Sequence, residues 1–407
     1  MKKKRDILFL CQFFYPEYVS SATLPYDTAL ALTKAGYKVG ALCGYPREYA
    51  KEKNFPLKET VNEISITRTK YLQLGRKNFL SRLINYFSFT FKIFLHLFEI
   101  AKYKAVVVYS NPPILPWVAA LAKKLFGTKL IFVAYDLYPE IAVLTDTLRE
   151  GNLICRVMNH INKVVYKKAD AVIALSSEMK EYIKKNRPIP EEKIHVIPNW
   201  YEDKKTENES GENSFTALTD SRFTIAYFGN MGIAQDMDTI LSAAEKLKDQ
   251  KDLCFLFAGH GKKFSLVKET LEKKGVKNAY LFEFLQGQRF QDALKIADCA
   301  LVSLAENLTG LCVPSKTYSY MMRGTPLIAI MDEGDIIEDI RSGAGAWVKN
   351  GESEKLAQII LEMKEDKEKV AQMKNRCRAI FEEKYTLETC TKKYVSLFHQ
   401  LLKQKNK

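Results

Sequence analysis

The sequence predicts an α/β protein with two domains. Apolar runs of strand length alternate with helical patterns along both halves of the chain, which is typical of parallel sheets covered by helices. The length of 407 residues exceeds the usual size of a single hydrophobic core. The polar, Glu- and Ser-rich segment Tyr201–Arg222 interrupts the alternation and is typical of a linker or mobile loop. We therefore expect one domain over residues 1–200 and a second over residues 223–385.

The first domain opens with a strand, a helix and a second strand. The opening strand is expected over Asp6–Phe14 and breaks at Tyr15. A polar turn with Ser20 and Ser21 then leads into a helix over Leu24–Lys34. This connection lacks GxGxxG, so a nicotinamide or flavin fingerprint is absent, but its amides could meet a diphosphate. Further strands are expected over Val39–Cys43, Ala105–Tyr109, Lys129–Ala134, Ala171–Leu175 and Lys193–Pro198.

The second domain repeats the same alternation of strands and helices. Strands are expected over Phe223–Phe228, Leu253–Ala258, Tyr280–Phe284, Cys299–Leu304 and Pro326–Ile330. Two amphipathic helices, Glu354–Lys364 and Thr386–Lys403, close the chain. The last helix, within residues 386–407, could cross back and pack on the first domain.

The segment Phe79–Tyr103 is apolar enough to suggest a membrane span. On a helix, however, its polar residues form one stripe, with members at Ser81, Asn85, Ser88, Lys92, His96 and Glu99. A membrane span would not keep such a stripe unless it packed on polar partners. Two interpretations stay open: a helix lying in the membrane interface, and a domain helix whose wide face enters the core. The basic start Met1–Arg5 favours the membrane, because each basic residue near an anionic surface contributes about 1 kcal/mol.

Composition narrows the choice of partners and compartment. The net charge of +14 and the pI near 9.1 favour acidic partners: nucleic acid, an anionic membrane or phosphorylated ligands. No basic–aromatic stripe supports nucleic acid, so we do not expect that partner. The eight cysteines form no CxxC pair, which predicts reduced thiols in a reducing compartment and no zinc site. The first apolar run is too short for a signal peptide.

The stretch Leu308–Pro326 is a candidate anion site. It follows the buried run Cys299–Leu304, so its loop lies outside the carboxyl end of a strand, where ligands bind in such folds. Pro314 fits the first turn of the helix that follows. Ser315 and Lys316 then place a hydroxyl and a cation near the free amides of a helix start, which suits a phosphate-type anion. The alternative is an ordinary capped helix.

Two pairs of carboxylates deserve comparison. Asp136 and Glu140 follow the strand Lys129–Ala134, where either could act as a general base or hold a hydroxyl. Alternatively Asp136 caps a turn and Glu140 is solvated or paired. Asp236 and Asp238 form a DxD pattern that can bind metal, but they stand at a probable helix start, which favours a helix cap.

The second domain also offers a glycine-rich loop and an aromatic strand end. The GxG pattern with two lysines is a weak phosphate-loop signal, formed by Gly259, Gly261, Lys262 and Lys263. The strand that follows ends with Phe282 and Phe284, which could stack on a base.

Six segments together resemble a family 4 glycosyltransferase of the GT-B fold, in the family's order and spacing. They are NPP at Asn111–Pro113, DLYPE at Asp136–Glu140, ALSSEM at Ala174–Met179, KIHVIPNW at Lys193–Trp200, GNMG at Gly229–Gly232 and GLCVPSK at Gly310–Lys316. The resemblance covers nearly the whole chain. It is closest to the subgroup that builds bacterial O-antigen and exopolysaccharide, including the fucosamine transferases.

The resemblance implies two Rossmann-like domains facing each other across a cleft, with the acceptor mainly on the first and a nucleotide-sugar mainly on the second. Transfer would retain the anomeric configuration without a metal or other cofactor, so cations and amides must stabilise the departing diphosphate. The donor-binding candidates are Gly229, Asn230, Gly259, Gly261, Lys262, Lys263, Phe284, Gly310, Leu311, Ser315 and Lys316. The catalytic candidates are Asp136 and Glu140, and those on the acceptor side are Tyr15, Ser20, Ser21 and Asn111.

The chain departs from the family's pattern at three points. The loop GNMGIAQDMD has no cation where most members carry an Arg and a Lys. The second of two glutamates eight positions apart would fall at Ser319. A common catalytic histidine has no clear counterpart.

We expect a transferase of hexosyl or N-acetylhexosaminyl type. It would move a sugar from a nucleotide diphosphate, UDP in the first instance, to a polyprenyl-diphosphate-linked glycan in bacterial surface-polysaccharide synthesis. It would be cytoplasmic and peripheral to the inner face of the cell membrane, meeting that anionic surface through Phe79–Tyr103 and the basic N-terminus. Two alternatives stay open: a non-catalytic partner of the same fold, and a sugar-nucleotide epimerase.

Overall fold

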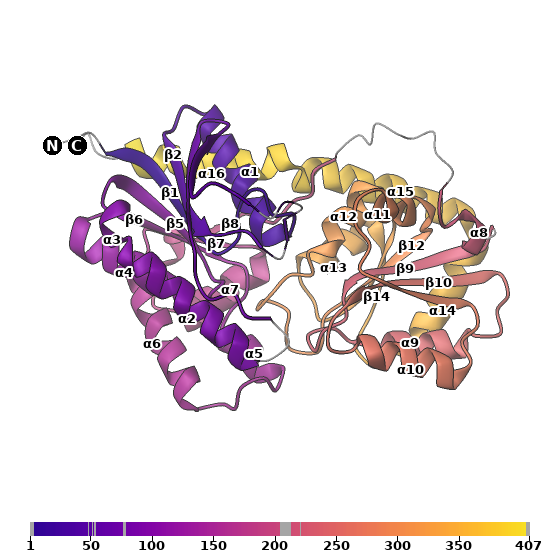
Figure 1. Cartoon of the computed structure of the whole chain (residues 1–407). Helices are drawn as coiled ribbons and strands as arrows, with labels where there is room; N and C mark the ends of the chain where they lie inside the picture. The colour runs from indigo at the N-terminus through magenta and orange to yellow at the C-terminus, as the bar shows by residue number, and fades with distance from the viewer. Residues whose placement is uncertain are drawn as a thin grey trace. The chain divides into compact units, whose positions relative to one another are not determined.

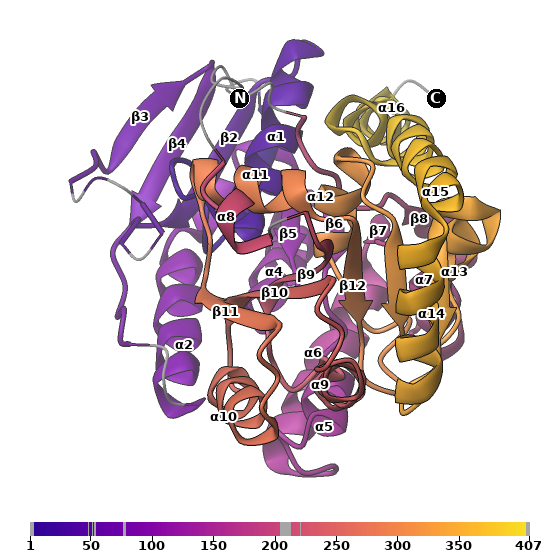
Figure 2. The ribbon, with the colours of Figure 1, turned by 90° about the vertical axis from the view of Figure 1, so that its right-hand side faces the viewer.

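The computed structural model describes residues 4–47, 49–50, 52, 54–75, 79–203, 213–219 and 221–403. They form two compact units, each with its own sheet (Figures 1 and 2). Unit 1 comprises Met1–Asn199, Gly310–Val313 and Leu387–Lys407, and unit 2 comprises Trp200–Thr309 and Pro314–Thr386. The predicted α/β class is confirmed. Residues 204–212 and 220 of the expected linker, and residues 1–3 of the basic N-terminus, lie outside the described residues.

Unit 1 is built on an eight-stranded sheet in the order β3-β4-β2-β1-β5-β6-β7-β8. All neighbours are parallel except the antiparallel pair β3 and β4. Strand β2 is buried along its length and β5 at every position except Lys104, as expected for parallel strands between two helix layers. The strands are β1 (Arg5–Cys11), β2 (Val39–Gly44), β3 (Lys58–Val61), β4 (Ile64–Thr69), β5 (Tyr103–Tyr109), β6 (Lys129–Ala134), β7 (Ala171–Ala174) and β8 (Ile194–Val196).

Helices cover both faces of this sheet. They are α1 (Ser20–Lys34), α2 (Phe79–Leu95), α3 (Leu97–Ile100), α4 (Leu115–Phe126), α5 (Glu140–Leu144), α6 (Leu153–Lys168), α7 (Ser177–Asn186) and α16 (Leu387–Lys403). Helices α1 and α16 lie together on one face, and α2, α3, α4 and α6 lie on the other (Figure 1). The last helix is held on unit 1 by the rings of Tyr37 and Phe398, 6.4 Å apart, and by Lys129, whose Nζ donates to the Leu401 carbonyl at 2.5 Å.

Unit 2 has a six-stranded, fully parallel sheet in the order β11-β10-β9-β12-β13-β14. Its strands are β9 (Phe223–Asn230), β10 (Leu253–His260), β11 (Ala279–Glu283), β12 (Cys299–Ser303), β13 (Leu327–Ile330) and β14 (Gly345–Val348). Its helices are α8 (Thr216–Thr219), α9 (Met237–Lys246), α10 (Phe264–Lys274), α11 (Gly287–Ile296), α12 (Lys316–Met322), α13 (Asp335–Asp339), α14 (Ser353–Glu365) and α15 (Lys367–Ile380). Helices α9, α10 and α14 cover one face, and α11 and α12 lie on the other (Figure 1), while α15 packs against both α12 and α14.

In each sheet the strand order reverses its direction once, and the candidate sites lie at the carboxyl ends of the strands on either side of that point. The reversal falls between β1 and β5 in unit 1 and between β9 and β12 in unit 2. Chain segments leaving the carboxyl ends of these strands diverge, and α/β folds bind ligands in the crevice that results. The loops at these points carry Tyr15 and Asn111 in unit 1, and Asn230 and the segment before Lys316 in unit 2.

The single helix expected over Phe79–Tyr103 is wrong in its extent. Helix α2 ends at Leu95, α3 is only one turn long, and Tyr103 already belongs to β5. Phe89 is fully buried while Phe98 is 77% exposed, so the segment has both a core face and an exposed apolar face. Within the described residues, no helix has the length and apolar character needed to cross a membrane.

Other element ends also differ from expectation. Strand β1 ends at Cys11, because the buried rings of Phe13 and Phe14 fill the core from a loop and not from the sheet ladder. Helix α1 begins at Ser20 and not at Leu24. Helix α12 begins at Lys316, so Pro314 precedes it and does not belong to its first turn. The pair β3–β4, the strand β14 and the helices α5 and α15 were not expected.

Asp236 is a helix cap, as the sequence favoured. It precedes α9, and its Oδ1 accepts from Thr239 N at 3.0 Å. Its Oδ2 accepts from Thr239 Oγ1 at 2.6 Å and from Asn350 Nδ2 at 2.8 Å. The carboxylate thus joins the start of α9 to the segment after β14. Asp238, by contrast, has a side chain that is 76% exposed.

We expect Asp236→Ala to destabilise unit 2 by about 2 kcal/mol, because it removes a cap and leaves buried donors unpaired. Urea unfolding followed by tryptophan fluorescence measures the loss, since Trp200 and Trp347 belong to unit 2. The matched control Asp238→Ala should cost less than about 0.5 kcal/mol. Equal losses in the two variants would contradict the assignment of Asp236 as the cap.

Candidate functional site

In unit 2 the strand ends of β9 and β10 lie in close backbone contact. The N–H of Met231 donates to the carbonyl of His260 at 2.6 Å. A Cβ on Gly259 would come 1.8 Å from the Gly229 carbonyl oxygen, and a Cβ on Gly261 would come 2.6 Å from the Met231 carbonyl oxygen. Only glycine permits this approach, so these residues of the GxG pattern fix the shape of the strand-end surface.

Lys316, the first residue of α12, brings an ammonium group to the same surface. Its Nζ lies 3.6 Å from the centre of the Tyr227 ring, and a Cβ on Gly229 would lie 3.5 Å from it. Lys316 is partly exposed as a residue, but Nζ itself is buried and has no hydrogen-bond partner among the described residues. Burial lowers the pKa of Lys316 from its usual 10.5 to about 7.

This environment suits an anion. A buried ammonium that lacks acceptors is costly, which is why its pKa falls. The face of the Tyr227 ring offsets part of that cost, by about 2 kcal/mol for a desolvated cation–π contact. A phosphate oxygen placed beside Nζ would supply both a hydrogen-bond acceptor and a negative charge. The environment of Lys316 is therefore compatible with the anion site that the sequence predicts, and that site stays a prediction.

The other predicted cations are placed differently. Lys262 is exposed, and Lys263 Nζ donates to the Gln235 carbonyl at 2.9 Å and lies 3.5 Å from Asp238 Oδ2. Lys263 is thus engaged within its own unit by the loop before α9. Asn230 and Ser315 are exposed, which leaves an amide and a hydroxyl accessible at the strand ends.

Of the two phenylalanine rings that could stack on a nucleobase, only one is exposed. The Phe282 ring packs edge-on against Phe215, with centroids 5.4 Å apart. The Phe284 ring is 47% exposed and lies 5.2 Å from the His260 ring. The two rings, tilted by 58° to each other, form an aromatic corner at the ends of β11 and β10, with the Phe284 ring open to a base.

Gly310 and Leu311 belong by their contacts to unit 1, whereas Ser315 and Lys316 belong to unit 2. The Leu311 carbonyl accepts from Leu137 N at 2.9 Å, and the Leu311 side chain is only 2% exposed. Gly310 has φ +84°, and a Cβ there would lie 3.2 Å from the Glu178 carbonyl oxygen. The segment Gly310–Val313 is thus fixed mainly through its backbone.

In unit 1, Asp136 stands directly after β6. The Oγ of Ser110, at the end of β5, accepts from the backbone N–H groups of Tyr135 and Asp136, each at 3.1 Å. Burial raises the pKa of Asp136 from 3.8 to about 6. A carboxyl group with a pKa near neutrality can bind or release a proton under physiological conditions, as a general base must.

Glu140 has a different environment, although it is only four residues away. Its Oε1 and Oε2 both accept from Arg187 Nη2 at 2.7 Å, and the Arg187 side chain is only 9% exposed. The guanidinium also faces the Tyr166 ring, 5.6 Å from its centre. Glu140 thus pairs with a cation, one of the two alternatives that its sequence position allowed.

The acceptor-side candidates lie around the β1 and β5 ends. The Tyr15 ring is 36% exposed and stacks on Tyr26 at 5.0 Å, and its carbonyl accepts from the buried Arg68 at 3.0 Å. Ser20 and Ser21 form the first turn of α1. Asn111 directly follows Ser110 and is partly exposed.

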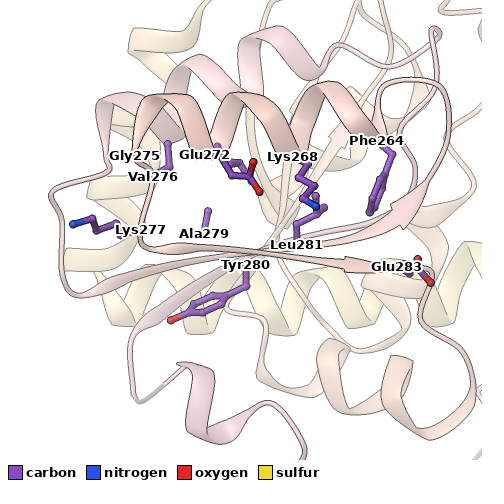
Figure 3. A pocket seen from close by; sticks show the side chains of 11 residues that line it. Phe264, Lys268, Glu272, Gly275, Val276, Lys277, Ala279, Tyr280, Leu281 and Glu283 are labelled. Atoms are coloured by element: carbon purple, nitrogen blue, oxygen red, sulfur yellow. The ribbon is translucent and has the colours of Figure 1, made fainter.

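Two further features lie apart from these residues. Among the described residues, no group of three or more His, Cys, Asp or Glu could hold a metal ion. A hollow of about 640 Å³ lies between α10 and the edge strand β11, and Figure 3 shows its lining, including Lys268, Glu272 and Tyr280. None of the predicted donor-site residues lines it.

Sequence reasoning missed several residues that the structure adds to the site. His260 stood between the two glycines of the GxG pattern, so its position next to the aromatic strand end could have been noticed. Ser110 stood directly before the NPP segment at a strand end. Tyr227 and Arg187 gave no such signal, because their partners Lys316 and Glu140 are distant in the sequence.

Comparison with known families identifies the class of protein. Residues 22–205 match the model of Glycosyltransferase Family 4, and residues 211–379 match that of Glycosyl transferases group 1. The chain belongs to the glycosyltransferases that combine these two domains. The family that the six sequence segments resembled is thereby confirmed.

Two curated relatives are named as glycosyltransferases. The chain is 28% identical over 240 residues to the probable glycosyltransferase WbjE of Pseudomonas aeruginosa, covering 58% of this chain and 59% of that protein. It is 24% identical over 257 residues to the putative colanic acid biosynthesis glycosyl transferase WcaI of Escherichia coli (strain K12), covering 60% of this chain and 62% of that protein. The chain thus spans about three fifths of the length of these curated relatives.

Solved structures show the same fold at low identity. Sucrose-phosphate synthase from Thermosynechococcus elongatus has a TM-score of 0.75 and 14% identity, covering 98% of this chain and 100% of that chain. HepE from Anabaena has a TM-score of 0.71 and 16% identity, covering 97% of this chain and 100% of that chain. WaaG, a glycosyltransferase involved in lipopolysaccharide biosynthesis, has a TM-score of 0.69 and 13% identity, covering 96% and 99%. The fold is therefore that of the GT-B glycosyltransferases.

We expect Lys316→Met to raise the stability of the ligand-free protein near neutral pH. The folded state releases the Lys316 proton near pH 7 and the unfolded chain near 10.5, so the wild type gains stability as pH rises through this window. The variant lacks this titration. Its advantage should be about 1 kcal/mol or more at pH 6.5 and should shrink toward pH 10. Urea unfolding at several pH values measures it.

The matched control is Lys262→Met, which removes an exposed ammonium from the neighbouring loop. Its stability difference from the wild type should be small and independent of pH. An equally flat difference for Lys316→Met would show that the Lys316 ammonium is solvated in solution.

Proposed function

We propose that the protein transfers a sugar from a nucleotide diphosphate, UDP in the first instance, with retention of anomeric configuration. Unit 2 holds the donor and unit 1 the acceptor. One observation carries this proposal: the buried Lys316 ammonium at the β9–β12 reversal, which lacks a hydrogen-bond partner among the described residues. The donor diphosphate is the anion that this cation would neutralise.

Lys316 would act mainly on the leaving group. When the sugar–phosphate bond breaks, negative charge develops on the departing diphosphate, and a fixed cation in a water-poor site stabilises that charge. The bound anion would also raise the pKa of Lys316 from about 7, so binding would keep the proton on Nζ. The transfer as proposed uses no metal or other cofactor.

The nucleoside end of the donor would meet the aromatic surface of Phe284 and His260. Stacking of a base on an aromatic ring contributes about 1–3 kcal/mol. The solved structures of Anabaena HepE contain UDP with glucose, or UDP-glucose. That likeness supports a UDP-sugar as the first donor to test, and the sugar as a hexose or N-acetylhexosamine.

The acceptor would be a polyprenyl-diphosphate-linked glycan at the inner face of the membrane. The names of the relatives support a role in polysaccharide synthesis, since WcaI is assigned to colanic acid and WaaG to lipopolysaccharide. Asp136 would hold or deprotonate the acceptor hydroxyl, and Tyr15 and Asn111 would line the acceptor side. Glu140, paired with Arg187, would help to fix the segment after Asp136.

We expect one class of nucleotide sugar to raise the melting temperature of the purified protein, and Lys316→Ala to abolish that shift. A ligand at 100 times its Kd stabilises the native state by about 2.7 kcal/mol. The measurement is thermal unfolding against UDP-, GDP- and TDP-sugars. Phe284→Ala should keep the preference for the nucleotide class but raise the Kd about tenfold.

The control Lys262→Ala should keep the full shift. A shift that survives in Lys316→Ala would remove this lysine from the donor site. No shift with any nucleotide sugar in folded wild type would favour the non-catalytic partner, because such a subunit need not bind donor. Conversion of the donor to another nucleotide sugar without acceptor would favour the epimerase.

We expect Asp136→Asn to lower kcat by about 10²- to 10⁴-fold, the usual contribution of a positioned acid or base. Wild-type kcat/KM should rise with pH through about 6, as Asp136 ionises, and the variant should lose this rise. Transfer to an acceptor glycan, measured between pH 5 and 8, tests both. An unchanged kcat would exclude Asp136 from the chemistry.

Glu140→Gln is the comparison variant. It leaves the buried Arg187 without its carboxylate, so its main effect should be a loss of stability of about 3 kcal/mol. A loss of kcat in a fully stable Glu140→Gln protein would instead assign Glu140 a direct catalytic role.

A further inference from the structure

Helices α2 and α3 expose a continuous apolar stripe to solvent. Phe87 and Phe91 are each 59% exposed, Leu95 is 57% exposed and Phe98 is 77% exposed. Their spacing of three and four residues places them on one side of the helical segment. Phe94, at 38% exposed, lies within the same stripe. Monomeric soluble proteins rarely leave a contiguous surface of large rings uncovered.

Polar residues help to fix the orientation of α2. Asn85 is 4% exposed; its Oδ1 accepts from Leu74 N at 2.8 Å and its Nδ2 donates to the Leu74 carbonyl at 2.9 Å. Ser88 Oγ donates to the Leu72 carbonyl at 3.4 Å. The front half of the polar stripe therefore faces protein backbone. A second apolar row, with Phe89 and Ile93 fully buried, meets the core, and the remaining rings are left outside.

Helices α4 and α6 extend this surface. The Trp117 ring of α4 is 39% exposed and stacks on Phe94 at 6.5 Å, and Phe126 of α4 lies 5.8 Å from Phe98. A hollow of about 420 Å³ is lined by Trp117 and by Arg156, Val157, His160 and Ile161 of α6. We define the apolar face as Phe87, Phe91, Phe94, Leu95, Phe98, Trp117, Leu125, Leu153 and Val157, each at least 38% exposed.

The charge on the helices of the apolar face is mostly positive, with the exposed Glu150 before α6 as an acid near its edge. Helices α2, α4 and α6 contain no Asp or Glu. Exposed cations stand among the rings or beside them, at Lys92, Lys124, Arg156 and Lys163. The acid on α3, Glu99, is paired with Lys102 at 2.6 Å. Lys4 Nζ donates to the Phe126 carbonyl at 3.3 Å, which brings the start of the described chain to the end of α4.

We propose that the apolar face docks on an anionic lipid bilayer, with its rings in the headgroup and upper acyl region. Large rings flanked by Lys and Arg are the composition of interfacial helices, which insert their apolar side and use cations for anionic lipids. A protein partner would have to match a mostly positive rim around an aromatic centre. The surface differs from the one expected from the sequence, since it spans four helices and excludes the inward half of the polar stripe.

Vesicle sedimentation of the full-length protein tests the proposal. Wild type should bind vesicles of phosphatidylcholine with 30% phosphatidylglycerol and bind pure phosphatidylcholine much more weakly. Phe91→Ser with Phe98→Ser should lower the partition coefficient at least about tenfold, because two exposed rings lose their apolar contact. Lys92→Glu with Lys124→Glu should lower it about fivefold per residue on anionic vesicles, with a weaker dependence on salt.

Leu266→Ser is the matched control, since Leu266 is 45% exposed on α10 of unit 2. It should bind like wild type. Thermal unfolding checks that each variant is folded. In a second measurement, lipids brominated near the headgroup should quench Trp117 fluorescence, and Trp117→Phe should remove that quenching because Trp117 is the tryptophan of the apolar face.

Three outcomes would overturn the proposal. The first is wild type that does not bind anionic vesicles. The second is binding that persists in folded Phe91→Ser/Phe98→Ser protein. The third is a concentration-dependent dimer in light scattering that this double variant abolishes, without any vesicle binding, which would assign the face to a second copy. None of these readouts depends on a nucleotide sugar, so failure of the donor assignment would leave the test intact.

Discussion

The Lys316 ammonium is the constraint on which the candidate donor site depends. Its Nζ is buried over the Tyr227 ring, lacks a hydrogen-bond partner among the described residues and has a pKa near 7. Helix α12 is locked in place nearby, because Tyr320 OH accepts from Phe228 N at 2.7 Å. Gly229 leaves the space that the Lys316 side chain fills. A core optimised for stability alone would not keep an unpaired cation there, so the free-energy cost is consistent with use by a ligand.

The two carboxylates after β6 show how tertiary partners separate residues of the same type. Asp136 follows a strand end whose backbone is fixed by Ser110, and burial raises its pKa to about 6. Glu140, four residues later at the start of α5, faces Arg187 and keeps a cation beside it. The first can exchange a proton near neutral pH, whereas the second is committed to an ion pair. Their roles in the proposed transfer differ for that reason.

Helix α2 has one apolar row in the core and another that is exposed to solvent. Its fully buried row, with Phe89 and Ile93, fills the layer between the sheet and solvent, and its outer row, with Phe87 and Phe91, enlarges an apolar surface with α3, α4 and α6. The pattern alone could not distinguish a core helix from an interfacial one, since both rows are aromatic. The structure shows that the helix has both properties. The proposed donor site on unit 2 and the proposed lipid-facing surface on unit 1 would suit an enzyme whose acceptor is lipid-linked.

The sequence by itself determined the class of fold, the family and the position of Lys316, because strand and helix periodicities and short motifs are local properties. It also identified Asp236 as a helix cap, since capping involves residues only three apart. Tertiary structure decided what depends on distant contacts: the ring of Tyr227 under Lys316, the pairing of Glu140 with Arg187, and which rows of α2 face outward. Local patterns give the type of each side chain, but burial and partners come from chain segments that only folding brings together.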